Sequence, residues 1–126
     1  MPGSIQASAV KNVKFLNGSI VAIAGGFGIG NDKNACMSPG LGLGASDVTI
    51  AGMTMTQTGS QPVTVGGMLH TSSHANGQGQ LNQNILIAEN IFFDLAYTQS
   101  GSAAVVSTYV QGATLRNNDL SNLPYR

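Results

Sequence analysis

The sequence predicts an all-β fold, a right-handed parallel β-helix (solenoid) of about four coils with two long loops, in one domain over residues 1–126. Three observations predict it: four stretches align without gaps, apolar residues alternate in each, and no helical stretch separates the copies. The stretches are residues 12–20, 47–55, 84–92 and 112–120, at offsets of 35, 37 and 28 residues. A strand that recurs at such intervals is typical of a solenoid, in which each repeat contacts its neighbours.

Each aligned stretch begins with a turn-forming residue and continues with an apolar–x–apolar alternation. The alternating pairs are Val13/Phe15, Val48/Ile50, Ile85/Ile87 and Ala113/Leu115. A period of two residues indicates a strand with one buried face. If successive copies stack about 4.8 Å apart, equivalent residues form interior columns. We therefore expect a column of Val13, Val48, Ile85 and Ala113, with Phe15 and Phe92 also in the core.

A further strand precedes most copies, and three short strands per turn are typical of the parallel β-helix. The candidates are residues 5–7, 41–43, 63–65 and 104–106. Asn90 and Asn118 share one position of the alignment with Gly18 and Met53, which predicts a short asparagine ladder. We expect these two asparagines to adopt left-handed backbone angles at the turn. A β-sandwich, which also uses short strands, is the main alternative.

Composition narrows the function classes. The chain has 5 Lys and Arg, 5 Asp and Glu, and a net charge of zero, so no basic patch predicts nucleic-acid binding. The 42% hydrophobic content argues against disorder, and no apolar run approaches the roughly 20 residues of a membrane span. Cys36 is the only cysteine, which excludes an intrachain disulfide. The first residues lack signal-peptide features, but a weakly charged, Asn/Ser/Thr/Gly-rich chain is common on secreted β proteins, so we expect an extracellular location.

Two long insertions, residues 25–40 and 66–83, are the expected loops. The first is glycine-rich, but no Lys-Ser/Thr follows, so it does not predict phosphate binding. The second contains His70 and His74. Their spacing of four suits a zinc pair only on a helix, and this stretch is rich in Gly, Ser and Asn, so we predict no metal and no cofactor. The histidines remain candidates for acid/base catalysis or sugar contact, with plain exposed loop residues as the alternative.

Acidic residues are scarce, which limits the candidates for glycoside chemistry. Two carboxyl groups about 5–10 Å apart are usual in glycosidases. Asp94 follows an apolar strand and leads to the segment of Tyr97, so it is the preferred catalytic candidate. Glu89 lies at a turn, where we expect it to be solvated and to contact substrate at most. Tyr97 and Tyr109 are candidates for stacking on sugar rings.

A longer pattern joins these residues. Val65-Gly66-Gly67 leads to His70 and His74, and residues 87–95 and 117–125 follow, the last ending Leu123-Pro124-Tyr125. The pattern, over about residues 40–125, resembles right-handed parallel β-helix proteins of the glycoside hydrolase and polysaccharide lyase (pectate-lyase-like) type. The resemblance implies a carbohydrate-active protein that contacts a polysaccharide or oligosaccharide, with catalysis at Asp94, His70 and His74. The calcium-type aspartate cluster of the pectate-lyase branch is missing.

The family continues for several more coils where this sequence stops at Arg126. We therefore expect an incomplete piece of a longer solenoid, inactive as an enzyme by itself. Open ends of a solenoid expose backbone edges and apolar columns, so we expect them to pair with another copy or to be covered by loops. A structural or self-associating module without catalysis, and a remnant without activity, are the alternative functions.

Overall fold

The computed structural model describes residues 5–7, 10–22, 27–29, 45–66, 82–95, 103–107 and 110–123. Those residues form strands and turns, with no helix among them. The strands are β1 (Ile5–Ala7), β2 (Lys11–Leu16), β3 (Ser19–Val21), β4 (Phe27–Ile29), β5 (Ser46–Ala51), β6 (Thr54–Thr56), β7 (Val63–Val65), β8 (Asn82–Ala88), β9 (Ile91–Phe93), β10 (Val105–Ser107), β11 (Val110–Arg116) and β12 (Asp119–Ser121). The chain is therefore all-β over its described part.

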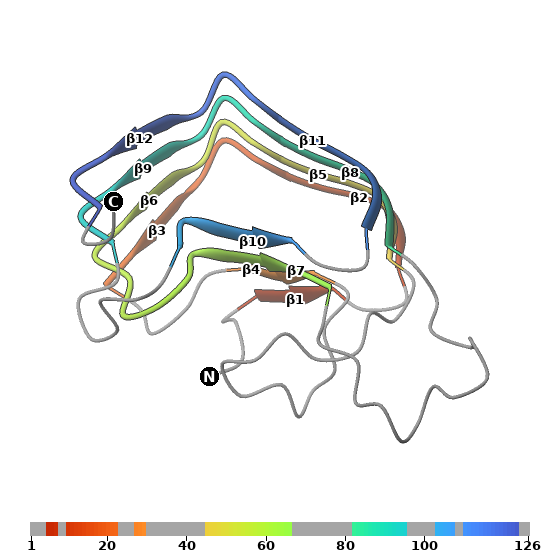
Figure 1. Cartoon of the computed structure of the whole chain (residues 1–126), viewed down its shortest axis with the longest axis horizontal. Helices are drawn as coiled ribbons and strands as arrows, with labels where there is room; N and C mark the ends of the chain where they lie inside the picture. Colours follow the sequence, from red (N-terminus) through yellow and green to blue (C-terminus); the bar gives the residue numbers. More distant parts are fainter. Residues whose placement is uncertain are drawn as a thin grey trace.

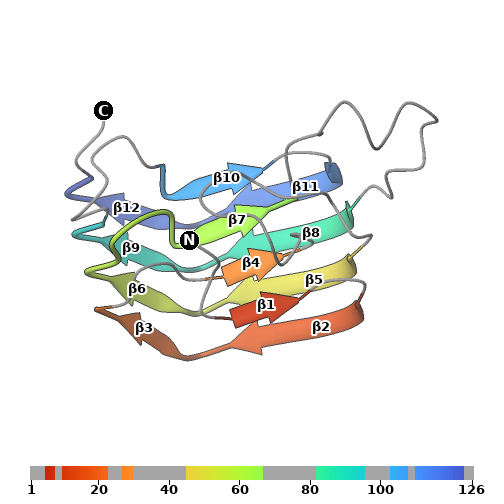
Figure 2. The ribbon, with the colours of Figure 1, turned by 90° about the horizontal axis from the view of Figure 1, so that it is seen from below.

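Three parallel sheets take their strands in strict rotation. One contains β1-β4-β7-β10, the second β2-β5-β8-β11 and the third β3-β6-β9-β12, each in that spatial order. The chain thus visits the same three sheets in the same order four times, as four successive strand triplets. Figure 1 looks along the stack and shows the second and third sheets as two slopes that meet at a corner, with the first sheet beneath them. Figure 2 shows the triplets lying one above another.

The register between successive triplets follows the sequence alignment. Val13 pairs with Val48, Val48 with Ile85, and Ile85 with Ala113, all in parallel, so the predicted column is confirmed. In the third sheet, Met55 similarly pairs with Ile20 and Phe92. A β-sandwich, which packs antiparallel sheets, does not fit these pairings.

The first sheet differs from the prediction in one strand. We expected residues 41–43 to supply its second strand and residues 25–40 to form a loop. The structure instead places β4 between β1 and β7, with Phe27 paired to both Ile5 and Val63. Residues 41–43 lie outside the described residues. The reason is that Phe27-Gly28-Ile29 has the apolar alternation of a strand, which the surrounding glycines conceal.

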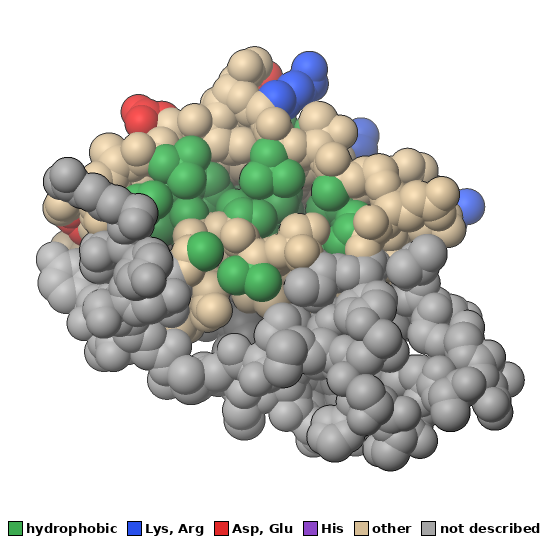
Figure 3. Space-filling view, in the orientation of Figure 1, with side chains coloured by type: hydrophobic (Ala, Val, Ile, Leu, Met, Phe, Trp, Pro, Cys, Tyr) green, Lys and Arg blue, Asp and Glu red, His purple; other side chains and the backbone are tan. Residues whose placement is uncertain are grey.

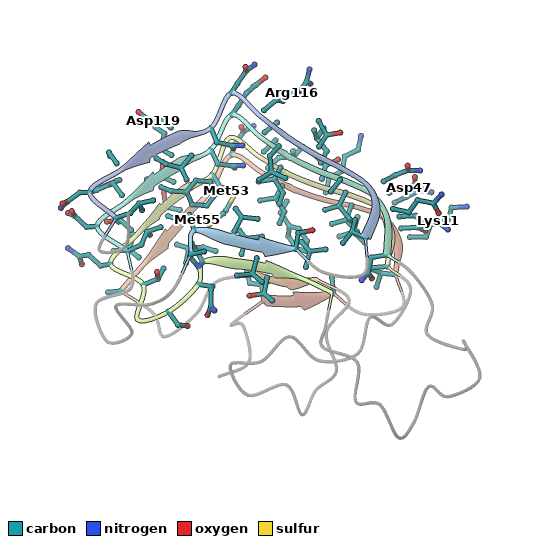
Figure 4. The ribbon with its side chains drawn as sticks, in the orientation of Figure 1. Lys11, Asp47, Met53, Met55, Arg116 and Asp119 are labelled. Carbon is teal, nitrogen blue, oxygen red and sulfur yellow. The ribbon has the colours of Figure 1, made fainter. Side chains whose placement is uncertain are left out.

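The core lies in the space between the three sheets. The buried side chains of the strands include Ala7, Val63 and Val65 from the first sheet, and from the other two sheets Val48, Ile50, Ile85, Ile87, Ile20, Met55 and Phe92. Figure 4 shows Met53 and Met55 inside this space, while Lys11 and Asp47 lie at an outer corner. Phe92 is fully buried and Phe15 packs against the core, as predicted. All three sheets therefore share one hydrophobic core.

The predicted asparagine ladder is present at the corner between the second and third sheets. The Met53 N–H donates to Asn90 Oδ1 at 2.9 Å, and the Asn90 N–H donates to Asn118 Oδ1 at 3.0 Å. Asn90 Nδ2 donates to the Ile50 carbonyl at 3.0 Å, and Asn118 Nδ2 to the Ile87 carbonyl at 2.9 Å. In the first triplet, the Gly18 N–H donates to the Met53 sulfur at 3.2 Å. Asn90 therefore links its triplet to the triplets on both sides, and Asn118 links the last triplet to the one before it.

The backbone angles at this corner correct one expectation. The left-handed residue is not the ladder asparagine but the residue before it, Glu89 (φ 57°) or Asn117 (φ 53°). The chain turns from the second sheet to the third at the residue with positive φ. The asparagine that follows it has ordinary backbone angles, and its side chain points inward to its hydrogen-bond partners.

Replacing the buried aromatic residue of β9 tests the shared core. Phe92→Ala should lower the free energy of unfolding by about 3–5 kcal/mol, because Phe92 is fully buried and a cavity would remain. Its neighbour Ile91, on the outer face, is 45% exposed, so Ile91→Ala should cost less than about 1 kcal/mol. Urea unfolding followed by circular dichroism measures both. Equal losses in the two variants would contradict the assignment of the inner face.

The ladder makes a second prediction. Asn90→Leu keeps the branched shape of the side chain but leaves the buried Met53 N–H without its acceptor, so it should destabilise the protein by about 2–4 kcal/mol. Asn118→Leu, in the half-exposed last position, should cost only about 1 kcal/mol because water can replace its bonds. The same unfolding measurement checks the pair, and a costlier Asn118 variant would be the opposite result.

Candidate carbohydrate-contacting site

Two of the six predicted site residues lie in the described part of the chain, namely Asp94 and Glu89. His70, His74, Tyr97 and Tyr109 lie outside the described residues. The geometry below therefore concerns the two carboxylates and their neighbours.

Asp94 occupies the turn that follows β9 and is half-buried. Asn122, at the equivalent turn after β12, donates from Nδ2 to Asp94 Oδ1. The Asp94 carbonyl accepts the Gln57 N–H from the preceding triplet at 2.9 Å. The Asp94 backbone is thus bonded to the triplet on one side and its carboxylate to the triplet on the other. A carboxylate beside an amide can accept and donate hydrogen bonds, which suits a hydroxyl-rich ligand.

Glu89 occupies the turn before β9 and is exposed, as predicted. Its N–H donates to the Arg116 carbonyl at 3.2 Å, which fixes the backbone and leaves the side chain outside. Glu89 and Asp94 therefore stand at opposite ends of β9. Five residue steps at about 3.3 Å place their Cα atoms roughly 15 Å apart. The two carboxylates therefore do not lie side by side at the separation of about 5 Å that a retaining glycosidase requires.

Glu89 and Asp94 both have left-handed backbone angles, and the corners of the fold account for these angles without a functional site. Three positions of every triplet have positive φ. They form the columns Asn12/Asp47/Asn84/Gly112, Asn17/Gly52/Glu89/Asn117 and Ala22/Gln57/Asp94/Asn122. Strained backbone often marks a functional site. Here the same angles recur in all four triplets, so the fold requires them and they give no evidence for catalysis.

The acid–amide pair is the feature that the sequence reasoning missed. Asp94 with Asn122 has a counterpart in Asp47 with Asn84, where Asn84 Nδ2 donates to Asp47 Oδ1 at 3.0 Å. Each pair joins equivalent turn positions of successive triplets. The gapless alignment contained this signal, because its offsets of 37 and 28 residues also relate Asp47 to Asn84 and Asp94 to Asn122.

The remaining chemistry of the described residues is sparse. No three His, Cys, Asp or Glu side chains within the described ranges gather as a metal site. The part of the chain that the structure describes has no helix of the length and apolar character that a membrane span requires.

Comparison of the chain with known protein families, with curated proteins and with solved structures gave no match.

Glu89 allows a test that separates its backbone from its carboxylate. Glu89→Gly should raise the free energy of unfolding by about 0.5–1 kcal/mol, because glycine adopts the left-handed angle without strain. Gly52 already occupies the equivalent corner of the preceding triplet. Glu89→Ala removes the carboxylate but keeps the strain, so its stability should stay near that of the parent protein. If both variants are destabilised equally, the carboxylate itself contributes to the fold.

Proposed function

We propose that the chain is a right-handed parallel β-helix of about four coils and that it is carbohydrate-active, glycosidase- or lyase-like, or a piece of such a protein. The support for the β-helix is the rotation of strands through three parallel sheets with register kept in each. The same architecture is what the resemblance of residues 40–125 implies. An extracellular location belongs to the same proposal.

The observation that carries the functional proposal is the half-buried Asp94 carboxylate held beside the Asn122 amide at a turn. In the proposed site, Asp94 exchanges a proton with the glycosidic oxygen or with attacking water, as a general acid or base. His70 and His74 supply the second acid/base group, since Glu89 lies at the opposite end of β9 from Asp94. Tyr97 and Tyr109 stack on sugar rings, and Glu89 binds a hydroxyl further along the chain of sugars.

Charge favours one substrate class over another. Polyanionic glycans, the substrates of lyases, are held by clustered cations, whereas this chain has a net charge of zero. A neutral polysaccharide and a hydrolytic reaction therefore fit the chain better than a polyuronate and elimination.

A panel of glycans tests the proposal. The protein is incubated with neutral xylan, arabinan and galactan and with anionic polygalacturonate. Binding is followed by affinity electrophoresis, hydrolysis by reducing-sugar release, and elimination by ultraviolet absorbance of the unsaturated product. We expect binding of a neutral glycan, and Asp94→Asn should reduce any turnover about 100-fold or more.

Asp47→Asn is the matched control, because Asp47 also accepts from an asparagine of the next triplet but at a different corner. It should leave binding and turnover unchanged. Neither binding nor turnover of any glycan by the folded protein would reject the proposal.

A second candidate function is a self-associating β-solenoid module without catalysis. It is favoured by the end formed by β10, β11 and β12, where Leu115 and Leu120 are exposed although their columns are buried in the two inner triplets. Figure 3 shows hydrophobic side chains gathered across the middle of this end.

A further inference from the structure

One short motif of the chain has no part in the proposed function. Asn17-Gly18-Ser19 has the form Asn-x-Ser with a residue other than proline in the middle, which is the acceptor pattern for an N-linked glycan. No other asparagine of the sequence has serine or threonine two positions later. An acceptor asparagine lies on a surface turn or loop, so the place of the motif in the fold decides whether it can be used.

The motif lies on the corner where the second sheet turns into the third. Asn17 is the residue with positive φ between β2 and β3, and Ser19 is the first residue of β3. Both side chains are exposed, whereas Ile20, which follows them, is buried in the core. Figure 1 shows this corner as the ridge at which the two slopes meet. The asparagine and the serine of the motif therefore both face away from the interior.

The exposure of this corner does not come from the place of the first triplet in the stack. Glu89 and Ile91 occupy the same two columns in the third triplet, which has a triplet on each side. Both of these residues are exposed as well. The outward direction of Asn17 and Ser19 is therefore a property of the corner itself.

The Asn17 amide is not used by the fold in the way that other asparagine amides are. Four asparagines donate a hydrogen bond from Nδ2 to a neighbouring triplet, namely Asn84, Asn90, Asn118 and Asn122. Within the described part of the chain, no such bond holds Asn17 Nδ2. Asn17 Oδ1 lies over Gly52, where any Cβ would collide with it, so the next triplet leaves room for this side chain. Attachment of a group at Nδ2 would therefore break no hydrogen bond of the stack.

We propose that Asn17 is the acceptor of an N-linked oligosaccharide, which extends from the corner into solvent. In the transfer, Asn17 Nδ2 bonds to the anomeric carbon of a lipid-linked oligosaccharide. The bond from that carbon to the lipid pyrophosphate breaks, and a base of the transferase takes the amide proton. Acceptor motifs of this kind are used in secreted proteins, so the inference rests on the extracellular location that belongs to the proposed function. The glycan adds a solubilising group to a chain in which only 8% of the residues are charged.

Secretion of the full chain from a eukaryotic cell tests the inference, with peptide mass spectrometry before and after enzymatic removal of N-glycans. We expect one oligosaccharide, attached at Asn17, on a protein whose circular dichroism shows the β fold. Its urea midpoint should be at least as high with the glycan as without it, because the corner gives up no hydrogen bond. A secreted protein without a glycan at Asn17 would overturn the proposal, and so would a midpoint that rises when the glycan is removed.

Two substitutions should abolish the modification by different routes. Ser19→Ala removes the hydroxyl that the acceptor pattern requires and leaves Asn17 in place, whereas Asn17→Gln removes the acceptor itself. Thr54→Ala is the matched control, because Thr54 pairs with Ser19 in the next triplet but follows Gly52 in place of an asparagine. The control should keep the glycan. A glycan retained in the folded Ser19→Ala protein, or lost in the control, would contradict the assignment.

None of these measurements depends on the binding or turnover of a polysaccharide. The modification at Asn17 can therefore fail while the carbohydrate-active proposal stands, and the reverse is equally possible.

Discussion

Parallel register between successive triplets is the constraint on which the rest of this structure depends. Because side chains alternate along a strand, a slip of one residue would move every interior residue of a strand to the outer face. The apolar columns resist such a slip, since Val48 and Ile85 are buried only in the observed pairing. Asn90 adds a polar lock, because its amide bonds to the triplets on both sides. Packing and hydrogen bonding therefore select the same register.

The corners are the second requirement of the fold, and they limit where the sequence is free to vary. A left-handed residue costs about 1–2 kcal/mol when it is not glycine, asparagine or aspartate. Most corner positions carry Asn, Asp or Gly, but Ala22, Gln57 and Glu89 accept the same angles. Their strain is offset by backbone bonds to the neighbouring triplet, such as Glu89 N–H to Arg116 carbonyl. The stacking of the triplets thus imposes left-handed backbone angles on residues whose own conformational preferences disfavour them.

The sequence predicted the second and third sheets, in which equivalent residues of successive triplets are separated by the same offsets. It missed one strand of the first sheet, where the offsets are different. The second and third sheets share the offsets 35, 37 and 28, so one gapless alignment predicted both, including the ladder of Asn90 and Asn118. Strands of the first sheet begin at Ile5, Phe27, Val63 and Val105, with unequal insertions on both sides, so no alignment located β4. For the candidate site, the turn position and exposure of Glu89 followed from the pattern. The Asp94–Asn122 contact did not, because both residues lie just beyond the aligned stretches, which end at Phe92 and Leu120.

The candidate site depends on the same stacking of triplets that forms the core. Asn122 belongs to the last triplet and also donates to Asp94 in the triplet before it. The Asp94 carbonyl also accepts the Gln57 N–H, so three successive triplets meet at this turn. A change that shifted the register of β12 against β9 would therefore separate the Asp94 carboxylate from its amide partner, so the geometry of the candidate site follows from the packing of the interior columns.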